Sequence, residues 1–236
     1  LAYFNRSSQY FELQQYEKAM ADCDQAIQLN PAYAPAYHNR GLVYATFQQY
    51  EKALTQYDLA IRLDSADPEL YKNRGGIYAK LRRFYEAMID LNRSLELDPS
   101  SITAHINRGA VYLELEKSVE ALTDFDRAIQ LDQNNSRAYI ARSLVYSDLE
   151  QHEMALADLD QAIRLDSNSA WAYHSRAVIN IHLHQYEKAL LDLDQAIEIE
   201  PSYTEAITIR DALQNQLQQN NQVLSDLNHI VQNNPA

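Results

Sequence analysis

Ala36-Tyr37-His38-Asn39-Arg40-Gly41 recurs every 34 residues, next as LYKNRG at 70–75 and then as AHINRG at 104–109. A second block, YEKA at 50–53, returns with the same period at 16–19 and 186–189. No insertion breaks the register. The chain therefore consists of seven copies of one unit, which we place at about 1–34, 35–68, 69–102, 103–136, 137–170, 171–204 and 205–236.

Each copy has the apolar periodicity of two helices. Tyr37, Gly41, Tyr44 and Phe47 are spaced four, three and three residues apart, which is one face of a helix, and residues 50–63 repeat that spacing. Only 48–49 lies between them, so the two helices are expected to run antiparallel. A single hairpin cannot bury its apolar surface alone, and stacking of neighbouring copies is what stabilises it. The sequence predicts an all-α solenoid of antiparallel helix pairs.

Composition excludes several classes of protein. The formal charge of −13 leaves no basic face for phosphate contacts, so no nucleic-acid partner is expected. No apolar run approaches the ~20 residues of a bilayer span, and no membrane insertion is expected. The single Cys23 and the lack of an N-terminal signal predict a cytoplasmic location. A periplasmic location follows instead if a leader has been removed.

The chain resembles the tetratricopeptide repeat (TPR) family over its whole length. The residues that carry the resemblance in the second copy are Tyr37, Gly41, Tyr44, Ala53, Tyr57 and Ala60. The resemblance implies a right-handed superhelix whose first helices line a concave groove that binds a peptide. The seventh copy departs most, with Asp211, Gln214 and Asn220 at positions where the family has small or aromatic residues, and we expect a polar cap or a frayed end there.

An arginine occurs inside the apolar stripe of every copy. A charge at such a position needs a partner, because leaving it unpaired costs several kcal/mol. The second helix offers an aspartate at about the same height in six copies, and Asp226 is the last of these. We therefore interpret the arginines as a structural ladder whose members are Arg40, Arg74, Arg108, Arg142 and Arg176, with Asp90, Asp124, Asp158 and Asp192 as partners.

The remaining face of each first helix forms the predicted peptide-binding groove. A column of amides at 5, 39, 73 and 107 resembles the asparagine ladder in the repeat region of O-linked N-acetylglucosamine transferase, and apolar residues follow it further along the chain. Trp171 is the only tryptophan and is the expected hot spot, together with Arg137 and His174. The predicted ligand-binding residues are Asn39, Lys72, Asn73, Ile106, Asn107, Arg137, Ile140, Leu144, Trp171, His174 and Val178.

Other site chemistries find little support. His182 and His184 are two residues apart on a helix, so they do not share a face, and neither do the Asp pairs such as Asp22 and Asp24. No metal site, no cofactor and no catalytic residue is therefore predicted. A match to the family's carboxylate clamp is incomplete, because Gly76 and Ala141 stand at two of its five places.

The sequence thus predicts a non-enzymatic scaffold that binds a peptide or protein segment in its groove. An alternative is the substrate-recruiting repeat region of a larger enzyme such as a glycosyltransferase. A third interpretation is an assembly module that self-associates through its end repeats.

Overall fold

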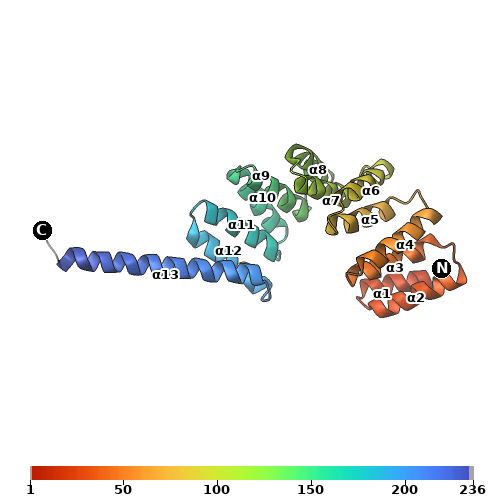
Figure 1. The fold of residues 1–236 in the computed structure, drawn as a ribbon, viewed down its shortest axis with the longest axis horizontal. Helices are drawn as coiled ribbons and strands as arrows, with labels where there is room; N and C mark the ends of the chain where they lie inside the picture. Colours follow the sequence, from red (N-terminus) through yellow and green to blue (C-terminus); the bar gives the residue numbers. More distant parts are fainter. Residues whose placement is uncertain (1, 234–236) are drawn as a thin grey trace. The chain divides into compact units, whose positions relative to one another are not determined.

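The computed structural model describes residues 2–233, with side chains through residue 220, and every element in this part of the chain is a helix. The chain divides into two compact units, residues 1–133 and 134–236. The first unit holds four antiparallel helix pairs, each corresponding to one predicted copy (Figure 1). Its helices are α1 (Ala2–Glu12), α2 (Tyr16–Leu29), α3 (Ala34–Thr46), α4 (Tyr50–Leu63), α5 (Pro68–Lys80), α6 (Phe84–Leu97), α7 (Ile102–Glu114) and α8 (Ser118–Leu131).

The second unit holds two such pairs and one long helix. Its helices are α9 (Ser136–Asp148), α10 (His152–Leu165), α11 (Ala170–His182), α12 (Tyr186–Ile199) and α13 (Thr204–Asn233). The all-helical repeat fold predicted from the sequence is confirmed. That both units belong to one solenoid over 1–236 remains a prediction. Among the helices of the described residues, none combines the length and apolarity needed to cross a bilayer.

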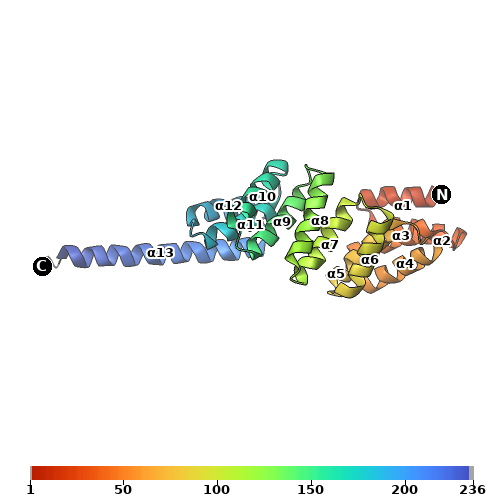
Figure 2. The same cartoon turned by 90° about the horizontal axis from the view of Figure 1, so that it is seen from above.

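The seventh copy differs from the predicted helix pair. Helix α13 runs without a break through Gln218, where the other copies turn (Figure 2). Other copies place a Gly, Ser or Ala where the two helices cross, but this copy has Asp211, whose exposed carboxylate accepts hydrogen bonds from Arg210 at 2.8 and 3.0 Å. The small residue that lets a second helix approach is therefore missing. The side chain of Asp226 lies outside the described residues.

The turn inside each hairpin has the same geometry in all six pairs. One residue adopts a left-handed conformation, with φ between 56° and 58°, and none of these residues is a glycine. The next residue donates its N–H to the carbonyl five positions back, as Gln49 does to Tyr44 at 2.9 Å. This is a Schellman motif, which satisfies carbonyls left free at the end of the first helix. The left-handed residues are Gln14, Gln48, Arg82, Glu116, Glu150 and His184.

The two helices of a pair touch where a small residue faces a large one. A Cβ added to Gly41 would lie 2.7 Å from the Tyr57 ring, and one added to Gly109 would lie 2.6 Å from the Phe125 ring. Tyr57 and Phe125 are fully buried. The absence of a side chain on the first helix thus makes room for an aromatic ring on the second, and the helices approach closely enough to exclude water.

Candidate peptide-binding site

The arginine of each first helix reaches across its hairpin to the second helix. Arg74 donates from Nε and Nη2 to both oxygens of Asp90, each at 2.7 Å. The same two-bond arrangement joins Arg108 to Asp124, Arg142 to Asp158 and Arg176 to Asp192. In the second copy the acceptor is the amide oxygen of Gln56, which bonds Arg40. These five arginine side chains are only 18% to 24% exposed.

The third nitrogen of the guanidinium reaches the preceding copy. Arg74 Nη1 lies 2.6 Å from Asp58, and Arg40 Nη1 lies 2.8 Å from Asp24. Arg108 instead donates to the neutral Asn92 at 2.8 Å. The guanidinium therefore serves two joints at once, one within a copy and one between copies, which a lysine with its single point charge could not do with the same geometry.

The predicted amide column in the first unit is partly occupied by the protein itself. Asn39 Nδ2 donates to Ser7 and Ser8 in the preceding copy, at 3.0 and 2.8 Å. Asn73 Nδ2 lies 2.8 Å from Nε2 of His38. Asn107, by contrast, forms no side-chain hydrogen bond with another described residue. Two of the four amides thus help to join neighbouring first helices, and Asn107 retains both of its polar atoms for a ligand.

A shallow hollow of about 310 Å³ lies against α3, α5 and α7 in the first unit. Lys72, Asn73 and Asn107 line it, beside apolar residues such as Leu42. Lys72 is engaged by the carboxylate of Glu69 one turn earlier. This hollow gathers three of the predicted ligand-binding residues, but most of its polar groups already have protein partners.

The second unit has a more apolar hollow of about 240 Å³, which we call the Trp171 hollow. Four predicted residues meet there: Leu144 from α9, and Trp171, His174 and Val178 from α11. Trp171 is 48% exposed. Ser143, Ser147, Ser175, Ile179 and Glu205 complete the lining.

His174 is the unusual group of the Trp171 hollow. Its side chain is buried, and both ring nitrogens are buried without a hydrogen-bond partner among the described residues. The Tyr203 ring lies 5.0 Å away, and the nearest charge is Glu205, whose Oε1 is 3.9 Å from Nε2. Burial lowers the pKa of His174, although Glu205 opposes this shift. A neutral imidazole with two unused nitrogens therefore lines a hollow that also holds apolar side chains, serines and one carboxylate.

Four predicted ligand-binding residues line neither hollow, namely Asn39, Ile106, Arg137 and Ile140. Ile140 is only 2% exposed and packs in the core with Leu159 and Ala172, and Ile106 is also buried. In the repeat they share one position with His38 and His174. Ile140 packs with Ala172 of the following copy, and His174 approaches Glu205 of the following copy at 3.9 Å. The assignment of Ile106 and Ile140 to a ligand is corrected accordingly. Arg137 is exposed in the first turn of α9 but does not line the hollow.

Sequence reasoning missed Ser143, Ser147, Ile179 and Glu205 as lining residues. Glu205 follows Trp171 by 34 residues, so it occupies the same position in the next copy, and the repeat period itself was the signal that could have found it. Ser147 lies one turn after Ser143 on α9 and has no distinctive sequence signal.

Groups that could support other chemistry are few. Among the described residues, no three His, Cys, Asp or Glu side chains are arranged to hold a metal ion. Cys23 is fully buried, and burial raises the pKa of its thiol to about 11, so the thiol stays protonated at neutral pH.

Repeat families match nearly all of this architecture. "Tetratricopeptide repeat" families match residues 44–106, 102–135, 136–169 and 172–203, and a "TPR repeat" family matches residues 8–46. No curated protein sequence matches the chain at a significant level.

Solved structures show the same fold. The APC/C hetero-tetramer Cut9-Hcn1 superposes with a TM-score of 0.82 at 18% identity, over 89% of this chain, and this chain spans only 42% of its length. PilF of Pseudomonas aeruginosa superposes with a TM-score of 0.75 at 19% identity, over 89% of this chain and 96% of its own. YrrB, described as a TPR protein with an unusual peptide-binding site, is 26% identical, with a TM-score of 0.57 over 80% of this chain and 97% of its own. The matches together cover most of residues 8–203, which hold nearly all of the six helix pairs of the structure, and the chain belongs to the tetratricopeptide repeat family.

Proposed function

We propose that this TPR protein is a non-enzymatic scaffold for protein–protein interaction and that it binds a peptide segment of its partner in the Trp171 hollow. The observation that carries the proposal is His174. A buried polar group without a partner costs about 1–3 kcal/mol, and native proteins keep few of them. A ligand that hydrogen-bonds to the imidazole would remove this cost, so the group favours binding at this point.

The shape and lining of the hollow suit one large apolar side chain. Leu144, Val178 and the exposed part of Trp171 are apolar, and about 240 Å³ is the scale of a single anchoring residue rather than of a cofactor. Interface energy concentrates in such anchors, with tryptophan among the most effective residues. The ligand backbone beside the anchor would supply the hydrogen bond to His174.

Charge indicates what flanks the anchor. Glu205 lies at the hollow with most of its side chain exposed, and the chain carries a formal charge of −13. A basic residue next to the apolar anchor would therefore be favoured, and the association rate should fall as salt is added. The description of YrrB as having a peptide-binding site supports peptide recognition on a related repeat array.

A peptide selected against the full chain from a displayed random library provides the test. The strongest binder is synthesised and titrated while the fluorescence of Trp171 is followed. We expect the emission to change, and we expect Trp171→Ala to weaken binding about thirtyfold, which is ~2 kcal/mol at ~1.4 kcal/mol per decade. The selected peptide should carry an apolar residue next to Lys or Arg.

Tyr85→Ala is the matched control, because Tyr85 is a large aromatic residue on α6 that is 78% exposed and does not line the hollow. It should leave the affinity unchanged. Equal affinity of the Trp171→Ala variant and the wild type would contradict the proposed site. A Trp171→Ala variant that binds normally but melts earlier would assign Trp171 to the scaffold.

A further inference from the structure

The sixth copy lacks an aromatic ring that the five preceding copies have. Its position on α11 is occupied by Asn180, whereas the equivalent residues are Tyr10, Tyr44, Tyr78, Tyr112 and Tyr146. Because the copies share one backbone geometry, the tyrosines show what a ring at this position contacts.

In the first three copies the ring lies beside cations, and in the third it also packs against an apolar wall. Arg6 and Lys18 lie 5.9 and 5.4 Å from the centroid of the Tyr10 ring. Lys52 lies 5.5 Å from the Tyr44 ring. Tyr78 packs against a buried cluster that includes Leu54 of the preceding copy. The cations face the negative potential of the ring, which is a favourable cation–π arrangement.

The sixth copy keeps all of these surroundings. Arg176 and Lys188 are the equivalents of Arg6 and Lys18, and Leu156 is the equivalent of Leu54. Lys188 donates to Gln185 at 2.7 Å, just as Lys18 donates to Gln15 at 2.8 Å. Arg176 is held by Asp192 and by Asp160. The cations are thus fixed in place although the ring that they would face is absent.

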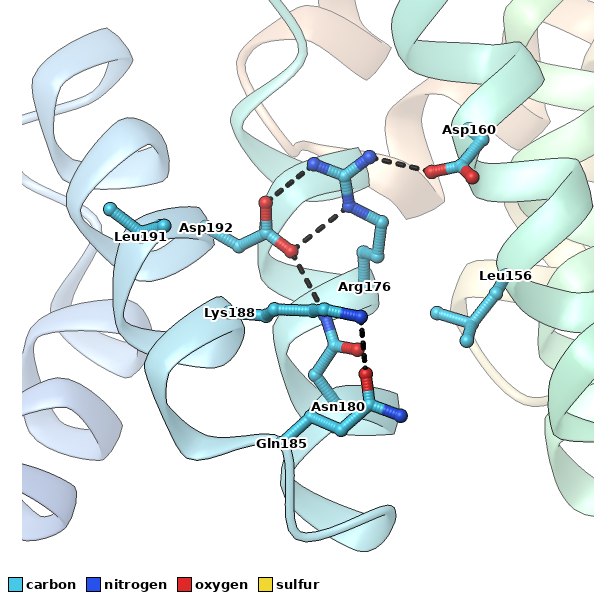
Figure 3. A pocket seen from close by; sticks show the side chains of 8 residues that line it. All are labelled: Leu156, Asp160, Arg176, Asn180, Gln185, Lys188, Leu191 and Asp192. Atoms are coloured by element: carbon cyan, nitrogen blue, oxygen red, sulfur yellow. Dashed lines mark hydrogen bonds and ion pairs between the residues drawn. The ribbon is translucent and has the colours of Figure 1, made fainter.

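The missing ring leaves a hollow of about 400 Å³ at the surface of the second unit (Figure 3). Asn180 is buried and turns toward Asp192, to which its Nδ2 donates at 3.2 Å, so the amide does not refill the space. Leu156 faces Arg176 and Lys188 from α10, and Leu191, 71% exposed, adds an apolar wall from α12.

We propose that this hollow, which we call the Asn180 hollow, binds an aromatic side chain presented by a partner polypeptide. The inserted ring would take the place that tyrosine occupies in the other copies, next to Leu156 and facing the cations of Arg176 and Lys188. An aliphatic side chain would meet the apolar wall but would gain nothing from the cations, so the site should prefer aromatic residues. The Asn180 hollow and the Trp171 hollow have no lining residue in common, and the two proposals can fail independently.

Nuclear magnetic resonance on the full chain tests the proposal with blocked pentapeptides. The probe is Ala-Ala-Tyr-Ala-Ala, and the comparison peptide is Ala-Ala-Leu-Ala-Ala. We expect the tyrosine peptide to shift the methyl signals of Leu156 and Leu191 and the side-chain amide of Asn180, with at least a fivefold lower Kd than the leucine peptide. Equal shifts from both peptides, or shifts from free p-cresol but not from the tyrosine peptide, would overturn the proposal.

Asn180→Tyr restores the ring within the chain, so the tyrosine peptide should no longer shift the methyl signals of Leu156 and Leu191. The melting temperature of this variant should be no lower than that of the wild type. Leu191→Glu is a second variant at an exposed position, where folding is not at risk. It should raise the Kd of the tyrosine peptide several-fold. Tyr44→Asn should create a second site that binds the tyrosine peptide, beside Arg40 and Lys52. Undiminished binding to the Leu191→Glu variant, or to a folded Asn180→Tyr variant, would refute the assignment.

Discussion

Arg176 holds Asp192 through two parallel hydrogen bonds, from Nε at 2.9 Å and from Nη2 at 2.6 Å, one to each carboxylate oxygen. This bidentate geometry uses the planar fork of the guanidinium, and it is shorter and stronger than a neutral hydrogen bond. Arg74 and Arg108 repeat it with Asp90 and Asp124. The arrangement explains how a charge can occupy the apolar stripe of the first helix in five of the six helix pairs, and Gln56 accepts the two bonds in the remaining pair.

Removing one partner of this pair should cost far more than removing an exposed ion pair. Asp124 is fully buried and also lies 2.9 Å from Nδ1 of His105. Asp124→Ala therefore leaves the largely buried guanidinium of Arg108 with Asn92 as its remaining acceptor. We expect a loss of about 3 kcal/mol in the free energy of unfolding. Glu96→Ala, which removes the exposed pair with Arg93, should cost at most ~1 kcal/mol. Urea denaturation compares the two, and equal small losses would refute a structural role for the ladder.

Two neighbouring glycines on α5 should respond in opposite ways to alanine. A Cβ at Gly75 would lie 2.9 Å from Leu91 and 3.3 Å from the carbonyl oxygen of Ala87, whereas one at Gly76 would meet only Asn107, at 3.4 Å. Overpacking costs about 1–3 kcal/mol, and alanine gains about 1 kcal/mol over glycine in a helix. We expect Gly75→Ala to lower stability by about 1–2 kcal/mol and Gly76→Ala to raise it by up to about 1. Thermal melts of both variants compare their stabilities. If both substitutions lower the melting temperature, the close approach of α6 at Gly75 is not the cause.

The hairpin turn offers a stabilising substitution. Glu116 is exposed and has a φ of 58°, which costs a residue with a side chain about 1 kcal/mol relative to glycine. Glu116→Gly should therefore raise the free energy of unfolding by up to about 1 kcal/mol. Lys117→Gly is the control, because Lys117 has a φ of −100°, so glycine relieves no backbone strain at this position. A lower melting temperature for Glu116→Gly than for the wild type would contradict the assignment of strain.

The stability of the second unit should fall on mild acidification because of His174. Burial lowers the pKa of this group in the folded state, so the unfolded chain binds more protons once the pH falls below the ordinary value of about 6.5. Stability from this source is present at neutral pH and is lost as the pH falls toward the lowered pKa. His174→Phe should flatten the decline in melting temperature between pH 7 and pH 5. An unchanged pH profile would show that His174 is not protonated on unfolding.

Much of the fold could be predicted because each copy repeats the same local signals. Gly41 opposite Tyr57 and the three-residue turn between their helices recur with small changes, so a wrong assignment in one copy is corrected by comparison with the next. The seventh copy is the exception. Its residues from Leu217 to Gln219 resemble the turn at 183–185, but the sequence of a turn does not form a hairpin when Asp211 prevents close approach of the second helix.

The candidate site was harder to predict, because small differences in a residue's angle about the helix axis decide whether its side chain lines the site. Trp171 and Val178 were assigned to a surface by their helical spacing, and they do line a hollow. Ile140 lies at a neighbouring angle on its helix, and there the following copy covers it. Asn73 could be placed on the correct face, but its bond to His38 depends on a side chain in another copy, which periodicity alone does not reveal.

The replacement of aspartate by Asn92 has a consequence for how the first unit comes apart. Arg40 and Arg74 join their copies to the preceding ones through charged acceptors, whereas Arg108 meets only a neutral amide. In a linear array the unfolding of one copy spreads to its neighbour only as far as their interface couples them. Of the three arginine bridges between copies in residues 1–133, the bridge between α6 and α7 is thus the one without an ion pair. Asn92→Asp should strengthen it and slow amide hydrogen exchange in α7 and α8.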